Sequence, residues 1–291
     1  MERFVRKSAI PESKTFVIRD LIAPHFDPKW HFHPEYQLFL VLKGRGTRFV
    51  GDQIKPFREN DMVFTGPNLP HLWRNDDWYF KKNESGQTRG IVIYFQPDLL
   101  LNLQNKEEME SIHHLLQLSA RGIEIKGETN RLVSRWMIEL LTLKGVPSII
   151  QLLRILDVLA KSGDCTPLAH AGYVNLNKES ETGRMTLVYE HVMKNFKQRL
   201  PLEEVASLTN MSVSSFSRYF KSRANKSFSN FLSEIRIGHA CKMLHEENTS
   251  ISQVSDESGF PTLTNFNKQF KEITGKTPLQ YKKAYLEQFR G

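Results

Sequence analysis

The sequence predicts an α+β protein in which a small antiparallel β-barrel is followed by helices and then by an all-α C-terminal segment. Three observations support this fold class. Short apolar runs bounded by turn residues recur at roughly ten-residue spacing in the first third of the chain. The middle third has apolar residues at helical spacing. The last 107 of the 291 residues contain one helix–turn–helix pattern twice, and a chain of this length fits two domains.

The barrel prediction rests on four short runs of strand-forming residues. They cover residues 36–42, 48–50, 61–64 and 91–95, and glycine-containing turns at 44–46, 51–52 and 66–67 separate them. Strands this short and this evenly spaced are typical of a small barrel or sandwich.

Polar residues that suit a ligand site accompany these runs. His31, His33 and Gln37 share the parity of Glu35 and Phe39, so on a regular strand all five face the same way. Later stretches add His71, Trp73 and Arg48, although core packing explains Trp73 equally well. We therefore predict a small-ligand pocket at the barrel mouth, lined by His31, His33, Gln37, Arg48, His71 and Trp73, with Tyr36 as a further neighbour.

The middle of the chain predicts two helices, over residues 132–140 and 152–159, with Pro147 between them and Gly163 as the stop. Their apolar faces mark burial either against the barrel or against a second copy of the chain, and both readings stay open. Polar, turn-rich residues 166–184 predict a linker between a first domain at 1–165 and a second at 185–291.

The repeat in the C-terminal segment has an offset of about fifty residues. Val205 and Val254 are 49 positions apart, and Phe216 and Phe266 are 50 apart, so the second copy has one extra residue in or just after its turn. Two helical hairpins of the same design are therefore predicted, which is the signature of a double helix-turn-helix.

Residues of matching type occupy the turns and the helix crossings. Asn210 and Gly259 lie at equivalent turn positions, where a positive φ is best tolerated by these residue types. Ala206 and Ser255 are small at the place where a second helix has to cross closely. These matches make two unrelated, solvated hairpins a much weaker explanation.

The second helix of each copy combines a buried stripe with a polar, basic face. Phenylalanines four positions apart form the stripe, at 216 and 220 and again at 266 and 270. Residues 185–291 hold 15 Lys and Arg against 10 Asp and Glu, which favours contact with phosphates. We predict DNA contacts from Ser214, Ser217, Arg218 and Lys221 in the first copy, and from Thr264, Asn267, Lys268 and Lys271 in the second.

The segment from about Met185 to Lys283 resembles the DNA-binding domain of AraC/XylS-type transcription regulators. The resemblance rests on Gly259-Phe260 and on the runs 265–271 and 275–281, which end in Lys271 and Tyr281. It implies a double helix-turn-helix bound to double-stranded DNA. Pro261 departs from the pattern, and we expect it to help start the recognition helix.

The histidines resemble the ligands of the cupin barrel, the sensor half of many AraC-type regulators. His31, His33 and His71 match that set, but Gln37 stands where metal-binding cupins have a glutamate. Three imidazoles and a carboxamide hold a transition metal less well than a set with a carboxylate does. We therefore expect an organic effector in a cupin-like barrel, with no metal and no cofactor.

Cysteine usage and hydropathy exclude several classes of protein. Cys165 and Cys241 are the two cysteines, and neither belongs to a Cys-x-x-Cys pair, which argues against a disulfide framework, a structural zinc site and an alkyl-transfer repair protein. No apolar run reaches about 18 residues, and the N-terminus has no signal-peptide core, so we expect a cytoplasmic protein without a membrane partner.

Taken together, these features predict a sequence-specific DNA-binding transcription regulator that responds to a small-molecule effector. We expect a homodimer, with RNA polymerase as a further partner. The alternative is a metal-dependent cupin enzyme with an accessory DNA-binding module. Gln37 and the lack of an obvious catalytic pair argue against it, so we expect no enzymatic activity.

Overall fold

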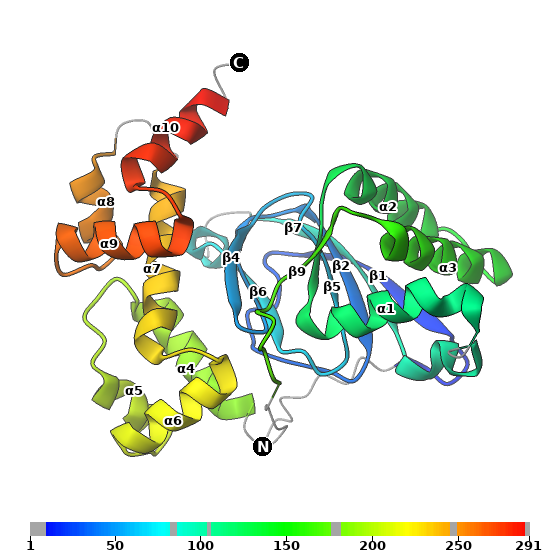
Figure 1. Cartoon of the computed structure of the whole chain (residues 1–291), viewed down its shortest axis with the longest axis horizontal. Coiled ribbons are helices and arrows are strands. Elements are labelled where there is room, and N and C mark those ends of the chain that lie inside the picture. Colours follow the sequence, from blue (N-terminus) through cyan, green and yellow to red (C-terminus); the bar gives the residue numbers. More distant parts are fainter. Residues whose placement is uncertain (1–9, 82–85, 104–105, 176–181, 245–248, 289–291) are drawn as a thin grey trace. The chain divides into compact units, whose positions relative to one another are not determined.

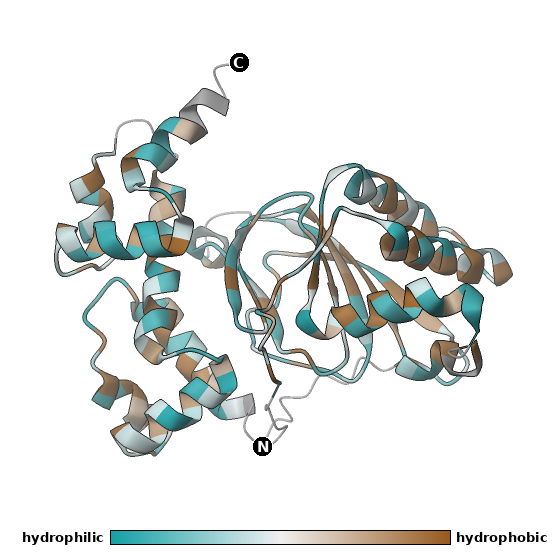
Figure 2. Ribbon diagram, viewed as in Figure 1, coloured by the Kyte–Doolittle hydropathy of each residue, from teal (hydrophilic) through white to brown (hydrophobic). Residues whose placement is uncertain are grey.

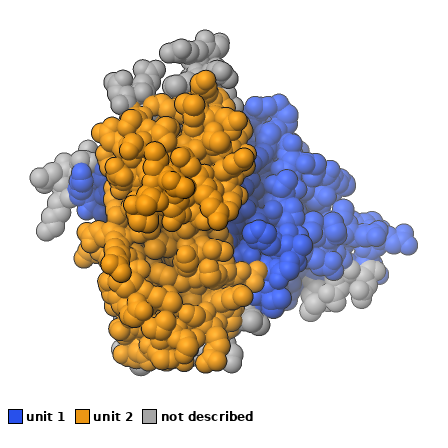
Figure 3. Space-filling view, turned by 60° about the vertical axis from the view of Figure 1, so that its left-hand side comes forward, with its two compact units in different colours: residues 1–182 blue, residues 183–291 orange. Residues whose placement is uncertain are grey.

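The computed structural model describes residues 10–81, 86–103, 106–175, 182–244 and 249–288. The chain forms two compact units, residues 1–182 and 183–291 (Figure 3). The α+β class predicted from the sequence is confirmed. Among the described residues, the first unit consists of strands, three α-helices and short 3-10 helices, and the elements of the second unit are all α-helices (Figure 1).

The first unit contains two antiparallel sheets. One has six strands in the order β1-β7-β2-β5-β8-β9, and the other has three in the order β4-β3-β6. The strands are β1 Phe16–Ala23, β2 Tyr36–Lys43, β3 Gly46–Val50, β4 Gln53–Phe57, β5 Met62–Thr65, β6 His71–Asn75, β7 Thr88–Phe95, β8 Ile123–Ile125 and β9 Cys165–Pro167.

Each face of the larger sheet is buried against a different partner. Phe39 and Val41 of β2 pack with Val50 and Trp73 of the smaller sheet and fill the barrel interior. The alternate residues of β2, such as Leu40, pack against the helices on the other face. Because both faces are covered, β2 is an almost continuous apolar run (Figure 2).

Helices α1 Glu110–Leu118, α2 Gly127–Leu140 and α3 Val146–Lys161 cover the outer face of the six-stranded sheet (Figure 1). Leu152, Ile155, Leu156 and Leu159 of α3 are all buried there. The helical prediction for this region is correct, except that Pro147 lies in the first turn of α3 rather than between the helices. Proline fits that position because its missing N–H has no helical acceptor there.

The second unit consists of seven helices among its described residues. They are α4 Thr182–Asn195, α5 Leu202–Leu208, α6 Val213–Ala224, α7 Phe228–Met243, α8 Ile251–Glu257, α9 Leu263–Thr274 and α10 Pro278–Gln288. The spacing of Val188, Val192 and Phe196 predicts a first helix that ends at Pro201. In the structure α4 ends at Asn195, and Pro201 is the N-cap residue of α5. The sequence also predicts a helix between the two hairpins, from near Ser229 to near Glu246; α7 is this helix, and Glu246 lies outside the described residues.

The chain between the units differs from the expected linker at 166–184. Cys165–Pro167 forms β9, and the side chains of Leu168 and Ala169 are buried against the barrel. The helix α4 already begins at Thr182. Leu168 and Ala169 are two apolar residues in a mostly polar stretch, and their burial fixes the start of this segment to the first unit.

Candidate DNA-binding and ligand-binding sites

The two helix-turn-helix hairpins have the predicted turns. Asn210 and Gly259 both adopt positive φ, at 55° and 81°. Helix α6 starts at Val213, three positions after Asn210, and α9 starts at Leu263, four positions after Gly259. The extra residue of the second copy therefore lies between its turn and its second helix.

Gly259 is required by a close approach as well as by its φ. A Cβ atom built there would lie 2.6 Å from the carbonyl oxygen of Lys197, in the segment that joins α4 to α5. Backbone cannot move aside as a flexible side chain can, so no other residue fits without a shift of the hairpin.

Buried phenylalanines hold the second helix of each hairpin. Phe216 and Phe220 of α6 and Phe266 and Phe270 of α9 are each 0% exposed, as the spacing predicted. The ring of Tyr281 packs edge-on against Phe270, with ring centroids 5.5 Å apart, which explains the tyrosine at the end of the C-terminal motif.

The predicted DNA contacts face outward from this framework. The exposed ones are Ser214, Arg218 and Lys221 on α6, and Thr264, Asn267, Lys268 and Lys271 on α9, while Ser217 is half-buried. Each helix thus presents hydroxyl and cationic groups, and α9 an amide as well, of the kinds that contact base edges and phosphates.

Hydroxyl caps fix where the two helices begin. The Ser212 hydroxyl accepts a hydrogen bond from the amide of Ser215, and the Thr262 hydroxyl accepts one from the amide of Asn265. Pro261 therefore precedes the cap of α9 and lies outside the helix, so the expectation that it starts the helix is corrected: Thr262 does this.

Three histidines converge at the end of the barrel. One ring nitrogen from each of His31, His33 and His71 lies within 4.8 Å of the other two. The Nε2 atoms of His33 and His71 lie 3.1 and 3.2 Å from Oε1 of Gln37. His33, Gln37 and His71 are all buried, with at most 3% of their surface exposed.

The other nitrogen of each ring is already engaged. Nδ1 of His31 lies 2.8 Å from the carbonyl oxygen of Lys29, and Nδ1 of His71 lies 2.7 Å from that of Leu69. Nδ1 of His33 lies 3.3 Å from a carboxylate oxygen of the buried Glu35. A carbonyl oxygen accepts only, so in His31 and His71 the proton is on Nδ1 and Nε2 keeps its lone pair, whereas the contact of His33 with Glu35 is an ion-pair distance without a hydrogen bond.

This arrangement fits a bound cation. Burial, followed by the neighbouring His31 and His33, holds the pKa of His71 well below its usual value, so its ring is neutral. Nε2 of His71 and Nε2 of His33 face the same Gln37 oxygen, so a metal ion would be held on this side of the two rings. Ligating histidines characteristically donate their second nitrogen to a carbonyl or carboxylate, as His31 and His71 do here to backbone carbonyl oxygens.

The geometry departs in two ways from the parity argument. β2 begins at Tyr36, so His31 and His33 do not lie on a regular strand; a backbone bridge between His31 and His71 brings them together instead. Tyr36 points to the opposite face of β2, where its ring stacks on Phe95 at 4.9 Å, and it lies outside the cluster.

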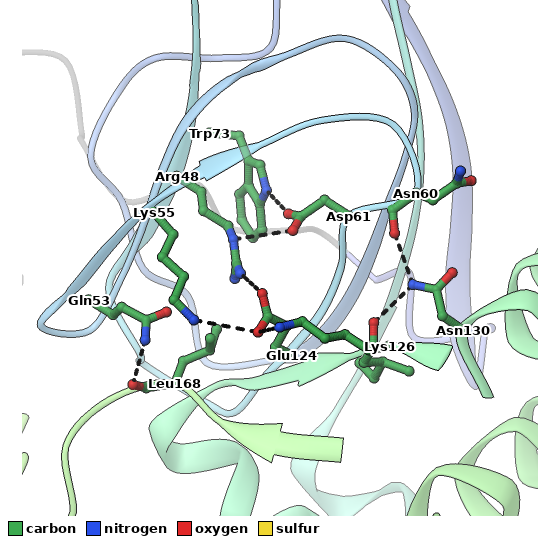
Figure 4. Close-up of polar contacts among 11 residues, drawn as sticks. Arg48, Gln53, Lys55, Asn60, Asp61, Trp73, Glu124, Lys126, Asn130 and Leu168 are labelled. Carbon is green, nitrogen blue, oxygen red and sulfur yellow. Dashed lines mark hydrogen bonds and ion pairs between the residues drawn. The ribbon is translucent and has the colours of Figure 1, made fainter. Parts of the chain in front are cut away.

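Arg48 and Trp73 were predicted to belong to the same pocket, but their polar atoms are engaged in a second cluster (Figure 4). The guanidinium of Arg48 pairs with Glu124 and lies 3.3 Å from Asp61, which also accepts from Trp73 Nε1 at 3.1 Å. Lys55 and Lys126 complete the network around Glu124 (Figure 4). Sequence reasoning missed Asp61 and Glu124, because Glu124 is 76 positions from Arg48.

Burial and charge set the two carboxylates of this cluster apart. Burial raises the pKa of Asp61, despite the nearby Arg48. Burial also acts to raise the pKa of Glu124, but Arg48, Lys55 and Lys126 outweigh it, and the result lies below the ordinary value. Arg48 is thus a cross-link between sheets rather than a free group in a pocket.

A cavity of about 970 Å³ lies beside this second cluster, between the β4–β5 connection and α2. Its lining includes Asp61, Glu124 and Asn130, and none of the three histidines. Asn130 donates to the carbonyl oxygens of Asn60 and Ile125, so it connects α2 to the β4–β5 connection and to β8 (Figure 4).

Two family models match the chain at the places where the geometry indicates two sites. The helix-turn-helix domain model matches residues 205–284, and the cupin domain model matches residues 19–77. YfiF of Bacillus subtilis, described as an uncharacterized HTH-type transcriptional regulator, is 23% identical over 268 residues, which cover 90% of this chain and 81% of YfiF. The transcriptional activator RhaR of Mannheimia succiniciproducens is 17% identical, covering 90% of this chain and 91% of RhaR.

The chain is a transcription regulator with an AraC-type helix-turn-helix domain and a cupin domain. Among solved structures, the regulator is similar to ToxT from Vibrio cholerae, with 14% identity and a TM-score of 0.35 over 92% of this chain and 97% of ToxT. The DNA-binding domain of AdpA in complex with a target DNA is 23% identical, with a TM-score of 0.33 over 35% of this chain and 91% of that domain. In the described part of the regulator, no helix combines the length and apolarity needed to cross a membrane.

Proposed function

We propose that the regulator binds a two-part operator in which α6 and α9 each enter the major groove of double-stranded DNA. The observation that carries this proposal is the pairing, in both helices, of fully buried phenylalanines with an exposed polar and basic face. The 16 residues of α7 connect the two hairpins and rise about 24 Å. Successive major grooves on one side of a duplex are about 34 Å apart, a span that two hairpins can cover.

Selection of bound sequences from a random DNA pool by the full-length protein tests this proposal. We expect two enriched blocks about one helical turn apart. Arg218→Ala should degrade one block and Asn267→Ala the other. Enrichment that is independent of sequence, or two variants that degrade the same block, would contradict it.

We further propose that the histidine cluster is the sensing site, and that its occupant is a divalent transition metal such as zinc. The sequence led us to expect no metal because Gln37 replaces a carboxylate. The support for a metal is the convergence of one nitrogen from each of the three rings, together with the carbonyl oxygens that accept from Nδ1 of His31 and His71. His31, His33 and His71 would hold the ion, with the Gln37 oxygen beside it. The site would bind rather than catalyse, so the regulator would not be an enzyme.

Metal content of the purified full-length protein tests the sensing site. We expect close to one equivalent of zinc after exposure to the metal and removal of excess, and a loss in His33→Ala. The exposed His114, on α1, offers a matched control, and His114→Ala should keep its metal. Less than roughly a tenth of an equivalent in the unaltered protein would leave an organic molecule as the occupant.

We also propose that the regulator works in the cytoplasm as a homodimer, with RNA polymerase as a further partner, and that the effector acts through the first unit. Removal of residues 1–182 should leave a domain that binds the operator more weakly and ignores the effector. A fragment that stayed fully responsive would place the sensor in the second unit.

A further inference from the structure

The segment after α3 is fastened to the barrel rather than free of it. We call residues Cys165–Asn175 the strap. Its first part is β9, which pairs with β8. Beyond β9, the amide of Leu168 donates to the carbonyl oxygen of Gly122 at 2.8 Å, and the amide of Ala169 donates to that of Arg121 at 2.9 Å.

Side chains of the barrel hold the strap further along. The guanidinium of Arg121 donates twice to the carbonyl oxygen of Ala169, at 2.9 and 2.6 Å. Gln53 Nε2 donates to the carbonyl oxygen of Leu168 at 3.0 Å, and the amide of His170 donates to Asp52 at 3.2 Å. The strap is the last part of the first unit that the structure describes before α4 begins.

Two neighbouring residues touch both the strap and the histidine cluster. The amide of Asn68 donates to the carbonyl oxygen of His33 at 2.7 Å, and its own carbonyl oxygen accepts a hydrogen bond from the Asn175 side chain. The carbonyl oxygen of Leu69 faces Nδ1 of His71 at 2.7 Å, and the Leu69 side chain belongs to the same buried cluster as Leu168.

We propose that Asn68 and Leu69 transmit the occupancy of the histidine cluster to the strap. This inference rests on the proposed sensing function of that cluster. A cation on Nε2 of His71 polarises the ring, which strengthens the hydrogen bond from Nδ1 to Leu69. The connection that carries both residues is then held more firmly, and the contacts of Leu168 and Asn175 with it persist for a larger fraction of the time.

The strap thereby sets how much chain is available between the units. With the strap docked, the contacts described for the first unit extend to Asn175. With residues 168–175 released, they end at Pro167, and the DNA-binding unit gains a tether whose r.m.s. reach is roughly 15 Å if it behaves as a flexible chain. A change of this size alters whether two copies of the second unit can engage neighbouring sites together.

Hydrogen exchange of the full-length protein with and without zinc tests the inference, with zinc binding measured in parallel. Peptides that cover residues 168–175 should exchange about fivefold more slowly with zinc, the factor expected from one strengthened hydrogen bond. Peptides from the centre of α3 should not change. In metal-free protein, His71→Ala should speed exchange of the strap. His31→Ala is the matched control, because the His31 ring faces the carbonyl oxygen of Lys29 and not that of Leu69.

Three outcomes decide the matter. Slower exchange of the strap with zinc, lost in His71→Ala, supports the inference. Zinc that binds without changing the exchange of the strap overturns it and leaves the sensing site in place. If zinc does not bind, the proposed metal is wrong, and the metal-free variants decide: equal exchange of the strap in His71→Ala and His31→Ala overturns the inference, and faster exchange in His71→Ala alone supports it.

Discussion

The two units place their candidate functional residues in opposite surroundings. In the second unit, the side chains proposed to contact DNA are almost all exposed, and fully buried phenylalanines hold the helices. In the first unit, His33, Arg48 and His71 are themselves buried, with at most 2% exposed, and take part in the packing. Substitution can therefore separate binding from stability in the second unit, whereas in the first the two properties are joined.

The largest expected effect comes from Arg48, where a site residue is also a structural one. Arg48→Ala leaves Asp61 and Glu124 without their buried cation, and should lower the free energy of unfolding of the first unit by about 3–5 kcal/mol. Denaturant unfolding measures this. Arg48→Met, which keeps the volume, should recover little, because the two carboxylates are still buried. A loss below about 1 kcal/mol in Arg48→Ala would mean that this cluster does not hold the sheets together.

A substitution at Gly259 should destabilise the second unit although it alters no proposed DNA contact. Gly259→Ala puts a Cβ atom 2.6 Å from the Lys197 carbonyl oxygen at a φ of 81°, and should cost about 1–3 kcal/mol of stability. Operator binding should weaken as a consequence. Asn210→Gly, at the equivalent turn, is the matched control and should be close to neutral. Equal effects at both turns would show that the contact with Lys197 does not matter.

A substitution on the surface of the second unit should weaken operator binding and leave stability almost unchanged. Arg218→Ala should weaken operator binding by about 1–3 kcal/mol, the value of one bidentate contact with a base. Its stability should stay within about 0.5 kcal/mol of the unaltered protein. Arg135→Ala, on the exposed side of α2, removes the same charge elsewhere and should leave operator affinity unchanged at moderate salt. Unchanged affinity in Arg218→Ala would remove this residue from the interface.

The smallest effect concerns acid stability. The pKa of Glu124 lies below its ordinary value in the folded state, so its ionisation stabilises the fold above the unfolded pKa, and this contribution is lost as the pH falls through the folded value. Glu124→Gln should therefore differ most from the unaltered protein near neutral pH and least in acid. Unfolding at a series of pH values measures this, with the exposed Glu128→Gln as control. A difference that grows in acid would reverse the assigned sign.

Sequence reasoning reached further in the second unit because its signals are local. The offset between Phe216 and Phe266 already placed the extra residue near the second turn, and Asn210 and Gly259 identified the positive φ positions. The turn and the buried face of each hairpin depend on residues three to five positions apart, so both can be predicted from the local sequence pattern.

In the first unit, the decisive partners are distant in the sequence. Arg48 and Glu124 are 76 positions apart, and the sequence near either residue does not indicate that they pair. The histidines were grouped correctly although the strand does not reach them, because a bridge to His71 replaces the expected alternation. The acceptors on Nδ1 of His31 and His71 are backbone carbonyl oxygens, those of Lys29 and Leu69, and composition does not reveal them.

The contact between Gly259 and Lys197 bears on where the DNA-binding part of the chain can be cut. The guanidinium of Arg236, on α7, donates to the carbonyl oxygens of Phe196 and Gln198, each at 2.8 Å, so α7 and the second hairpin both depend on the segment before α5. A fragment that begins at Val205, where the helix-turn-helix match begins, would retain every proposed DNA contact and lose this support. The smallest autonomous folding piece should therefore include α4 and begin near residue 183, where the second unit starts.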